Sequence, residues 1–244
     1  MNEPISSLKF TPEIRMNDTA NYSRWKYLLL VCLIALPITA VFTYPLLFNL
    51  DSHIVGVWAS DAVNHAWAAW WYHKAVTVLG QSPAEMTHIY YPTAVNHPLI
   101  TATAWAKLAV FPWLNISNPI RIYNLHLFLS RVLTWMFTSL LCLDLTQNKI
   151  GALLGGAIFT FSINLTTPAF YGHLTQTLTY AYPLLVLAFW RLYKKPEIKN
   201  GVLLGLAMSL LALIDLMPLA YFGIPMMLPD TAADNIFESL IQRE

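Results

Sequence analysis

Long apolar runs constrain the fold of this chain more than any other feature of its sequence. They cover residues 27–50, 120–145, 150–165, 177–193 and 202–228. A transmembrane helix needs about 20 predominantly apolar residues, and most of these runs approach or exceed that length. Only 11% of the residues are charged, against about 25% in soluble domains. The sequence therefore predicts an all-α, polytopic transmembrane helical bundle with about five spans.

Polar segments divide the chain around these runs. The expected segments are a polar tail at 1–26, a first span at 27–50, a large loop at 51–117, a transmembrane bundle at 118–228 and a polar tail at 229–244. Within the large loop, residues 100–114 are apolar but short for a span, and they contain Lys107 and Pro112. They are predicted to form an interfacial helix at the membrane surface.

The distribution of basic residues predicts the orientation. The segment 191–200 and the N-terminal tail are both basic, so both are predicted to be cytoplasmic. An even number of crossings must join them, which holds if the short interfacial helix does not cross. The loops 51–117 and 166–176 then lie outside the cytoplasm, in a multi-pass protein of the cytoplasmic membrane. Asp61 and His173, which belong to these two loops, are therefore predicted on the same side.

Asp61 is the leading candidate for chemistry in the large loop. Residues 51–99 hold five of the seven histidines and four of the nine tryptophans. Asp61 opens the segment DAVNHAWAAWWYHKAV, in which Asp61 and His65 would share one face of a helix. A carboxylate there could act as a general base or hold a metal, while Trp67 and Trp71 stack on a sugar. The alternative is an amphipathic interfacial helix with Asp61 as its N-cap.

The other candidate residues have less specific surroundings. Glu85 could pair with Asp61 to hold a metal or a diphosphate, or could be an exposed loop carboxylate. The histidines lack HxxxH or HExxH spacing, which argues against zinc and leaves a carboxylate-bound Mg²⁺ or Mn²⁺ open. Arg121, at the outer end of the second span, could bind a lipid phosphate or extend to the headgroups. His173, in the turn YGHL, could transfer a proton, contact a phosphate or be a surface histidine.

Several short motifs occur in a fixed order between residues 43 and 196. They are TYPL, SDAVNHAWAAWW, IYYP, NPIRIYNL, GALLGGAIFTFS, YGHLTQ and YPLLVLAFWR. In this order they resemble the membrane-embedded glycosyltransferases of the GT-C class, in particular their bacterial members. The resemblance implies a polyprenyl-phosphate sugar donor and a lipid, glycan or protein acceptor outside the cytoplasm. It also implies that Asp61 is the catalytic aspartate of the first outer loop and that Arg121 is placed for the donor phosphate.

The chain departs from this family in length, because such proteins usually contain more spans and often a soluble domain. We therefore expect a truncated member, or one half of a split protein whose bundle a partner chain completes. Two other functions stay open. One is a non-catalytic membrane subunit or remnant, and the other is a small-molecule transporter that uses His126, Arg131 and Asp215 within its spans.

The expected partners follow from the same features. The apolar runs require a lipid bilayer, and the resemblance implies a lipid-linked sugar. The formal net charge of +1 gives no reason to expect a nucleic-acid partner.

Overall fold

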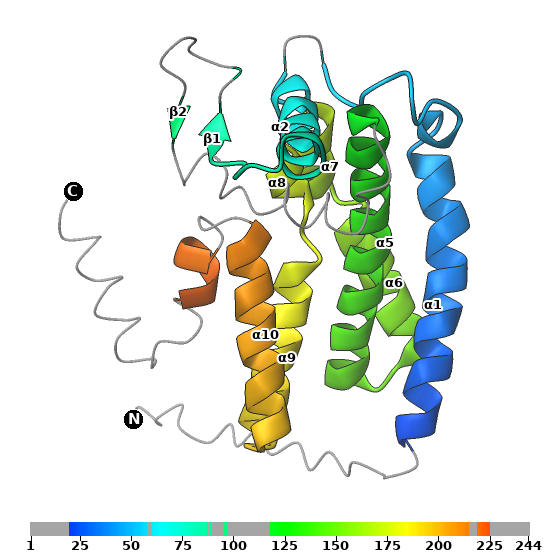
Figure 1. The fold of residues 1–244 in the computed structure, drawn as a ribbon. Coiled ribbons are helices and arrows are strands. Elements are labelled where there is room, and N and C mark those ends of the chain that lie inside the picture. The colour runs from blue at the N-terminus through cyan, green and yellow to red at the C-terminus, as the bar shows by residue number, and fades with distance from the viewer. Residues whose placement is uncertain are drawn as a thin grey trace, which may run out of the picture.

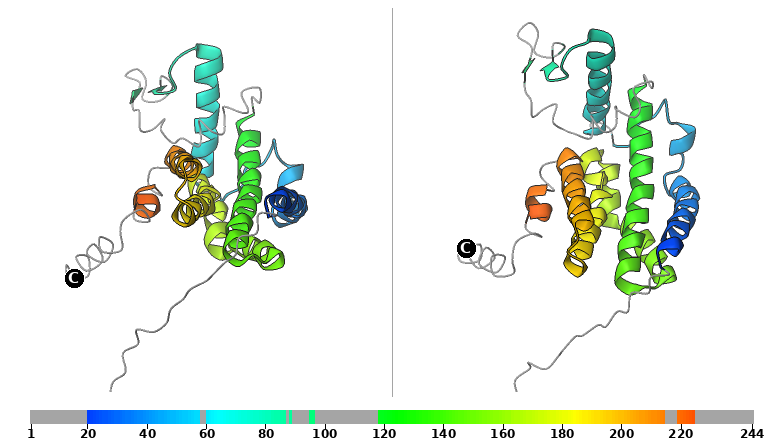
Figure 2. Two further views of the ribbon diagram at one scale, coloured as in Figure 1. Left: turned by 90° about the horizontal axis from the view of Figure 1, so that it is seen from below. Right: turned by 60° about the horizontal axis from the view of Figure 1, so that its bottom comes forward.

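The structure, a computed structural model, describes residues 20–57, 60–86, 88, 95–96, 118–214 and 219–224. Its long helices lie side by side in a bundle (Figure 1). They are α1 (Ala20–Phe42), α5 (Pro119–Thr146), α6 (Lys149–Thr160), α9 (Ala181–Lys194) and α10 (Ile198–Ile214). The central helix is α5, because it packs against α1, α6 and α9 (Figure 2).

Shorter elements gather at one end of the bundle, which we call the α2 end (Figure 1). They are α2 (Ala62–Lys74), the π-helix η2 (Ala75–Leu79), the strands β1 (Glu85–Met86) and β2 (Val95–Asn96), α7 (Ile163–Phe170) and α8 (Leu174–Thr177). The two strands pair antiparallel. A 3-10 helix, η1 (Leu46–Phe48), follows α1, and a π-helix, η4 (Leu219–Gly223), comes after α10 in the chain.

Among the described residues, three segments are long and apolar enough to cross a membrane: Arg24–Phe42, Pro119–Thr146 and Lys149–Phe170. At this level they confirm the prediction of a mostly helical protein with helices that are long and apolar enough to cross a membrane. The helices α9 and α10 have 14 and 17 residues, which is shorter than the about 20 residues of a span. The count of five spans and the location in the cytoplasmic membrane stay predictions.

The third apolar run is broken rather than continuous. The sequence predicts one helix at 150–165 and a loop at 166–176, whereas α6 ends at Thr160 and α7 runs on to Phe170. The prediction of a loop is therefore wrong over residues 166–170. Polar residues suggested a loop there, but the Thr166 hydroxyl donates a hydrogen bond of 2.9 Å to the Ser162 carbonyl within the helix. The predictions for residues 100–114, Asp215 and 229–244 fall outside the described residues.

The turn between α5 and α6 follows from local sequence. Asn118 caps the first N–H groups of α5, and Asn148 does the same for α6. Gln147, which lies between the end of α5 and Asn148, adopts the left-handed conformation with φ of 56° and so ends α5. The two helices then approach closely, because a Cβ on Gly156 would lie 2.9 Å from the carbonyl oxygen of Trp135. This packing ties α6, and the bend beyond it, to the central helix.

Asp144 joins three helices at the end opposite the α2 end. Its carboxylate lies 3.1 Å from Nη2 of Arg24 on α1 and 2.7 Å from Nε of Arg191 on α9. Only 6% of the Asp144 side chain is exposed, so one buried carboxylate is shared by two partly exposed guanidinium groups. Arg24 and Arg191 belong to the two basic segments that are predicted to be cytoplasmic. These segments share one end of the bundle, and the side of the membrane that this end faces stays a prediction.

Candidate functional site

Asp61 and His173 meet at the α2 end of the bundle, although 112 positions separate them in the sequence. Nδ1 of His173 lies 2.9 Å from Oδ2 of Asp61. Both side chains are about half exposed, 53% for Asp61 and 43% for His173. The structure thus brings together two residues that the number of membrane crossings predicts on the same side of the membrane. A solvent-accessible carboxylate beside an imidazole is suited to proton transfer, and we call it the Asp61–His173 pair.

Asp61 stands at the start of α2 without capping the helix. No capping hydrogen bond forms to its side chain, and its backbone is helical, with φ of −62° and ψ of −13°. Ser60 Oγ instead accepts a long hydrogen bond, 3.4 Å, from the N–H of Ala62. Asp61 therefore occupies the N-cap position of α2, but its carboxylate binds His173 instead of capping the helix.

Two side chains of α5 hold the segment that leads to Asp61. The Tyr123 hydroxyl donates to the carbonyl of Val55 at 3.0 Å. Nδ2 of Asn124 donates to the carbonyls of Leu50 and His53 at 2.9 and 2.7 Å. Both Tyr123 and Asn124 are fully buried, so these hydrogen bonds are shielded from competing water. The segment before α2 therefore has a fixed path over the central helix.

The same segment touches the turn before His173 at the level of the backbone. The N–H of Val57 donates to the carbonyl of Phe170 at 3.1 Å. Gly172 has φ of 75°, and a Cβ on it would lie 2.6 Å from Oγ of Ser60. Glycine is required here because both the backbone conformation and the close contact exclude a side chain. This contact sets the two members of the Asp61–His173 pair side by side.

We expect Gly172→Ala to destabilise the protein more than Gly80→Ala. A left-handed alanine costs about 1–2 kcal/mol at either position, since φ is 75° at Gly172 and 62° at Gly80. At Gly172 the contact with Ser60 adds an overpacking cost of about 1–3 kcal/mol, whereas no atom lies within 4 Å of a Cβ at Gly80. Unfolding of both variants in mixed micelles of SDS and a non-ionic detergent measures the difference. Equal losses would contradict a tight contact at Gly172.

His65 lies one turn along α2 from Asp61 and is half-buried. Its backbone N–H donates to the Asp61 carbonyl at 2.9 Å. Burial lowers the pKa of His65, the Asp61 carboxylate acts in the opposite direction, and the charge of His173 lowers that pKa further. The imidazole of His65 is therefore neutral at pH 7, with one nitrogen as donor and the other as acceptor.

Mutations of Asp61 and of His173 should shift the pKa of His65 in opposite directions. Asp61→Asn removes a negative charge that favours the protonated ring, so the pKa should fall further. His173→Gln removes a positive charge that disfavours it, so the pKa should rise. A histidine NMR titration of the protein in lipid nanodiscs measures both shifts. Shifts of the same sign in the two variants would contradict this arrangement.

Arg121 is bound by Asp51 at the start of α5. Its Nε and Nη2 atoms donate to the two carboxylate oxygens of Asp51. These hydrogen bonds hold the pKa of Asp51 below its usual range. Both side chains are nearly half exposed, at 44% and 47%, so an anion could reach the remaining N–H groups of Arg121. Its contact with a lipid phosphate stays a prediction.

The tryptophans of α2 form a small core of their own. Trp71 is 1% exposed, and its Nε1 donates to the carbonyl of Pro83 at 2.9 Å. The ring of Trp67 is parallel to that of Trp71, with 6.4 Å between the centroids. Trp67 is only half-buried, so it has the more accessible ring for a sugar. The substrate-binding roles of Trp67 and Trp71 stay predictions.

Glu85 lies in β1 with an exposed side chain, and it pairs through its backbone with Asn96 of β2. In the part of the chain that the structure describes, no group of three or more His, Cys, Asp or Glu side chains is placed to hold a metal ion. Because Mg²⁺ can be held by one or two carboxylates together with substrate phosphates, a carboxylate-bound Mg²⁺ or Mn²⁺ stays a prediction. No step proposed below involves a metal.

Sequence reasoning did not identify several residues that shape this end of the bundle. Asp51 was not recognised as the counter-ion of Arg121, and Tyr123 and Asn124 were not recognised as supports of the segment before α2. The available signal was weak: each is a polar or amphipathic residue at the edge of, or inside, an apolar run. Such residues are expected to bind other protein groups in a membrane, but their partners lie 68 to 74 positions away in the chain.

Comparisons of the chain with protein-family models, with curated proteins and with solved structures gave no match. The chemistry of this end of the bundle is therefore inferred from its own side chains and from the order of its sequence motifs.

Proposed function

We propose that this protein is a membrane glycosyltransferase of the GT-C type, which transfers a sugar from a polyprenyl-phosphate donor to an extracytoplasmic acceptor. The observation that carries the proposal is the Asp61–His173 pair, an exposed carboxylate with an imidazole 2.9 Å away. The order of motifs between residues 43 and 196 supports it. The proposal includes five spans in the cytoplasmic membrane, with the α2 end outside.

Asp61 acts as the general base in this mechanism. The acceptor hydroxyl gives its proton to Asp61 while its oxygen forms a bond to C1 of the sugar. The bond from C1 to the phosphate oxygen breaks, and the electron pair leaves with the polyprenyl phosphate. Oδ2 of Asp61 accepts a hydrogen bond from His173, which leaves Oδ1 for the acceptor hydroxyl. His173 thereby fixes the orientation of the carboxylate.

Positive groups at the α2 end stabilise the leaving phosphate. As an imidazolium, His173 donates from Nδ1 to Asp61 and from Nε2 to the phosphate, whose negative charge grows as the bond breaks. Arg121 supplies further charge-assisted hydrogen bonds from the N–H groups that Asp51 does not use. Trp67 provides an aromatic face for the sugar, and the buried ring of Trp71 supports it.

The proposal is tested by comparing membranes that contain the full-length protein with membranes that lack it. Polyprenyl phosphates that carry different tritiated hexoses serve as donors, and an extract of the cell envelope serves as acceptor. We expect chain-dependent transfer of label from at least one donor, with release of an equal amount of polyprenyl phosphate. The absence of chain-dependent transfer from every donor would contradict the proposal and favour the alternative of a non-catalytic subunit or remnant.

A further inference from the structure

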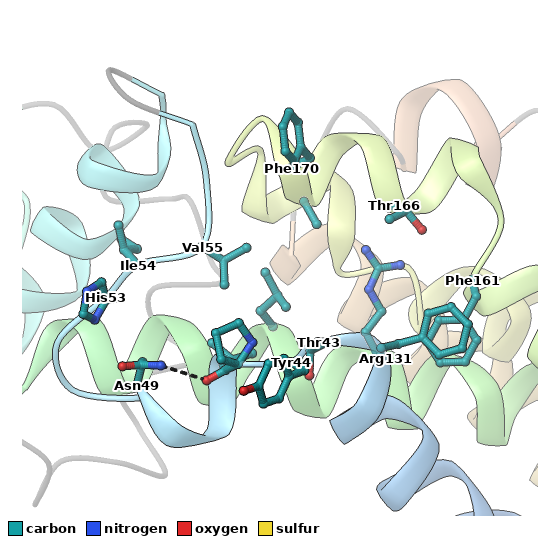
Figure 3. Close-up of a pocket in the computed structure, with 15 residues that line it drawn as sticks. Thr43, Tyr44, Asn49, His53, Ile54, Val55, Arg131, Phe161, Thr166 and Phe170 are labelled. Atoms are coloured by element: carbon teal, nitrogen blue, oxygen red, sulfur yellow. Dashed lines mark hydrogen bonds between the residues drawn. The ribbon is translucent and has the colours of Figure 1, made fainter.

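A cavity of about 560 Å³ lies between the end of α1, the central helix α5 and the bend between α6 and α7 (Figure 3). Its volume falls within the roughly 300–1,000 Å³ of typical small-molecule sites. Most of its wall is apolar. Phe42, Leu127, Phe161 and Phe170 contribute large side chains to it. The cavity could therefore enclose an apolar chain.

Arg131 brings a buried positive charge into this apolar wall. Its side chain extends from α5 toward Thr166 (Figure 3), and the residue is only 4% exposed. Nη1 donates to the carbonyl of Thr160 at 3.1 Å, and Nη2 donates to that of Leu165 at 2.6 Å. These carbonyls flank the bend between α6 and α7, so Arg131 satisfies backbone groups there.

The two carbonyls leave the charge of Arg131 without a counter-ion. They occupy two of the five N–H donors of a guanidinium and cannot neutralise it. No carboxylate forms an ion pair with Arg131 among the residues that the structure describes. A buried charge without an opposite charge is costly in protein and in lipid. An anionic group in the cavity would stabilise it.

Arg131 is the only residue with a permanent charge among those that line the cavity, which favours a ligand with a single negative charge. The hydroxyls of Thr43 and Thr166 donate to the carbonyls of Thr39 and Ser162 at 2.8 and 2.9 Å. Nδ2 of Asn49 donates to the carbonyl of Pro45 at 3.1 Å. A phosphate monoester carries about −1.5 to −2 charges and three acceptor oxygens, which one guanidinium cannot match. A carboxylate has one charge and two oxygens, which fit the guanidinium fork.

We propose that this cavity binds a long-chain monocarboxylate, with its carboxylate on Arg131 and its alkyl chain against the phenylalanine side chains of the wall. This lipid site is distinct from the site of sugar transfer and does not depend on the function proposed above. Phe170 belongs to the wall of the cavity, and its carbonyl binds the N–H of Val57. A bound ligand would therefore contact one of the segments that position the Asp61–His173 pair.

Equilibrium binding of tritiated palmitate to the full chain in a non-ionic detergent tests this site. We expect saturable binding that Arg131→Gln weakens about tenfold or more, because glutamine keeps a hydrogen-bond donor but removes the charge. Unlabelled laurate should displace palmitate more effectively than dodecyl phosphate does. Non-saturable binding, an undiminished affinity in Arg131→Gln, or stronger competition by dodecyl phosphate would overturn the proposal.

A second pair of variants decides the question if Arg131→Gln does not fold. Thr166 and Thr167 are adjacent, exposed residues of α7, and of the two only Thr166 lines the cavity. Thr166→Trp should fill the cavity and weaken palmitate binding about tenfold or more, whereas Thr167→Trp should leave binding unchanged. Equal affinities in these two variants would contradict a ligand in this cavity.

Discussion

Asp61→Asn is expected to lower the rate of sugar transfer by about 100-fold or more, since a positioned general base contributes roughly 10²–10⁴ to a rate. Asparagine has the shape of aspartate, and its side-chain oxygen can still accept the hydrogen bond from His173. The variant should therefore fold normally while lacking a group that can take the acceptor proton. The rate is measured as tritiated sugar transferred per unit of folded chain.

Asp61→Glu is the matched comparison for this prediction. It keeps a carboxylate but displaces it by one methylene, so it should retain more activity than Asp61→Asn. The thermal unfolding midpoints of both variants should stay close to that of the wild type, because Asp61 is 53% exposed and does not cap α2. A rate for Asp61→Asn within a few-fold of wild type would contradict a role as general base.

Among the carboxylates that the structure describes, we expect Asp144→Asn to cause the largest loss of stability. It leaves Arg24 and Arg191 without the buried carboxylate that lies between them. Removing one partner of a buried ion pair costs about 3–5 kcal/mol. Unfolding of the variant in mixed micelles of SDS and a non-ionic detergent measures this loss.

Glu197→Gln serves as the control for that replacement. Glu197 pairs with Lys199 at 2.6 Å, but the side chains are 47% and 75% exposed. Exposed ion pairs contribute little to stability, so Glu197→Gln should be hardly distinguishable from wild type. A similar unfolding profile for the Asp144 and Glu197 variants would contradict the view that Asp144 holds three helices together.

The sequence was sufficient to predict the helical class and that Asp61 and His173 lie at the same end of the bundle. Apolar run length predicted the three helices that are long and apolar enough to cross a membrane, because a bilayer requires about 20 apolar residues per helix. Charge distribution and crossing parity then placed two distant loops at the same end. That reasoning uses only the lengths of the apolar runs and the positions of the basic residues, so it does not require exact helix boundaries. It holds although α7 replaces part of the expected loop at 166–176.

The details of the site depended on contacts that sequence patterns do not encode. The bend after Thr160 is stabilised by Arg131 from another helix, so local propensity could not reveal it. The positions of Gly56 and Gly172 matter because their backbones approach residues far away in the chain. Trp71 looks like an exposed aromatic residue in sequence, yet it is buried because Pro83 and Met86 fold back over it. Each case requires the tertiary structure.

A double-mutant cycle on Asp61 and His173 tests most directly that the two residues act as one unit. The sugar-transfer rates of Asp61→Asn, His173→Ala and the double variant are compared with the wild-type rate. Because His173 acts partly by orienting Asp61, the loss of rate in the double variant should be clearly smaller than the product of the two single losses. If the two losses multiply, the residues act independently, and the Asp61–His173 pair is not the site of transfer.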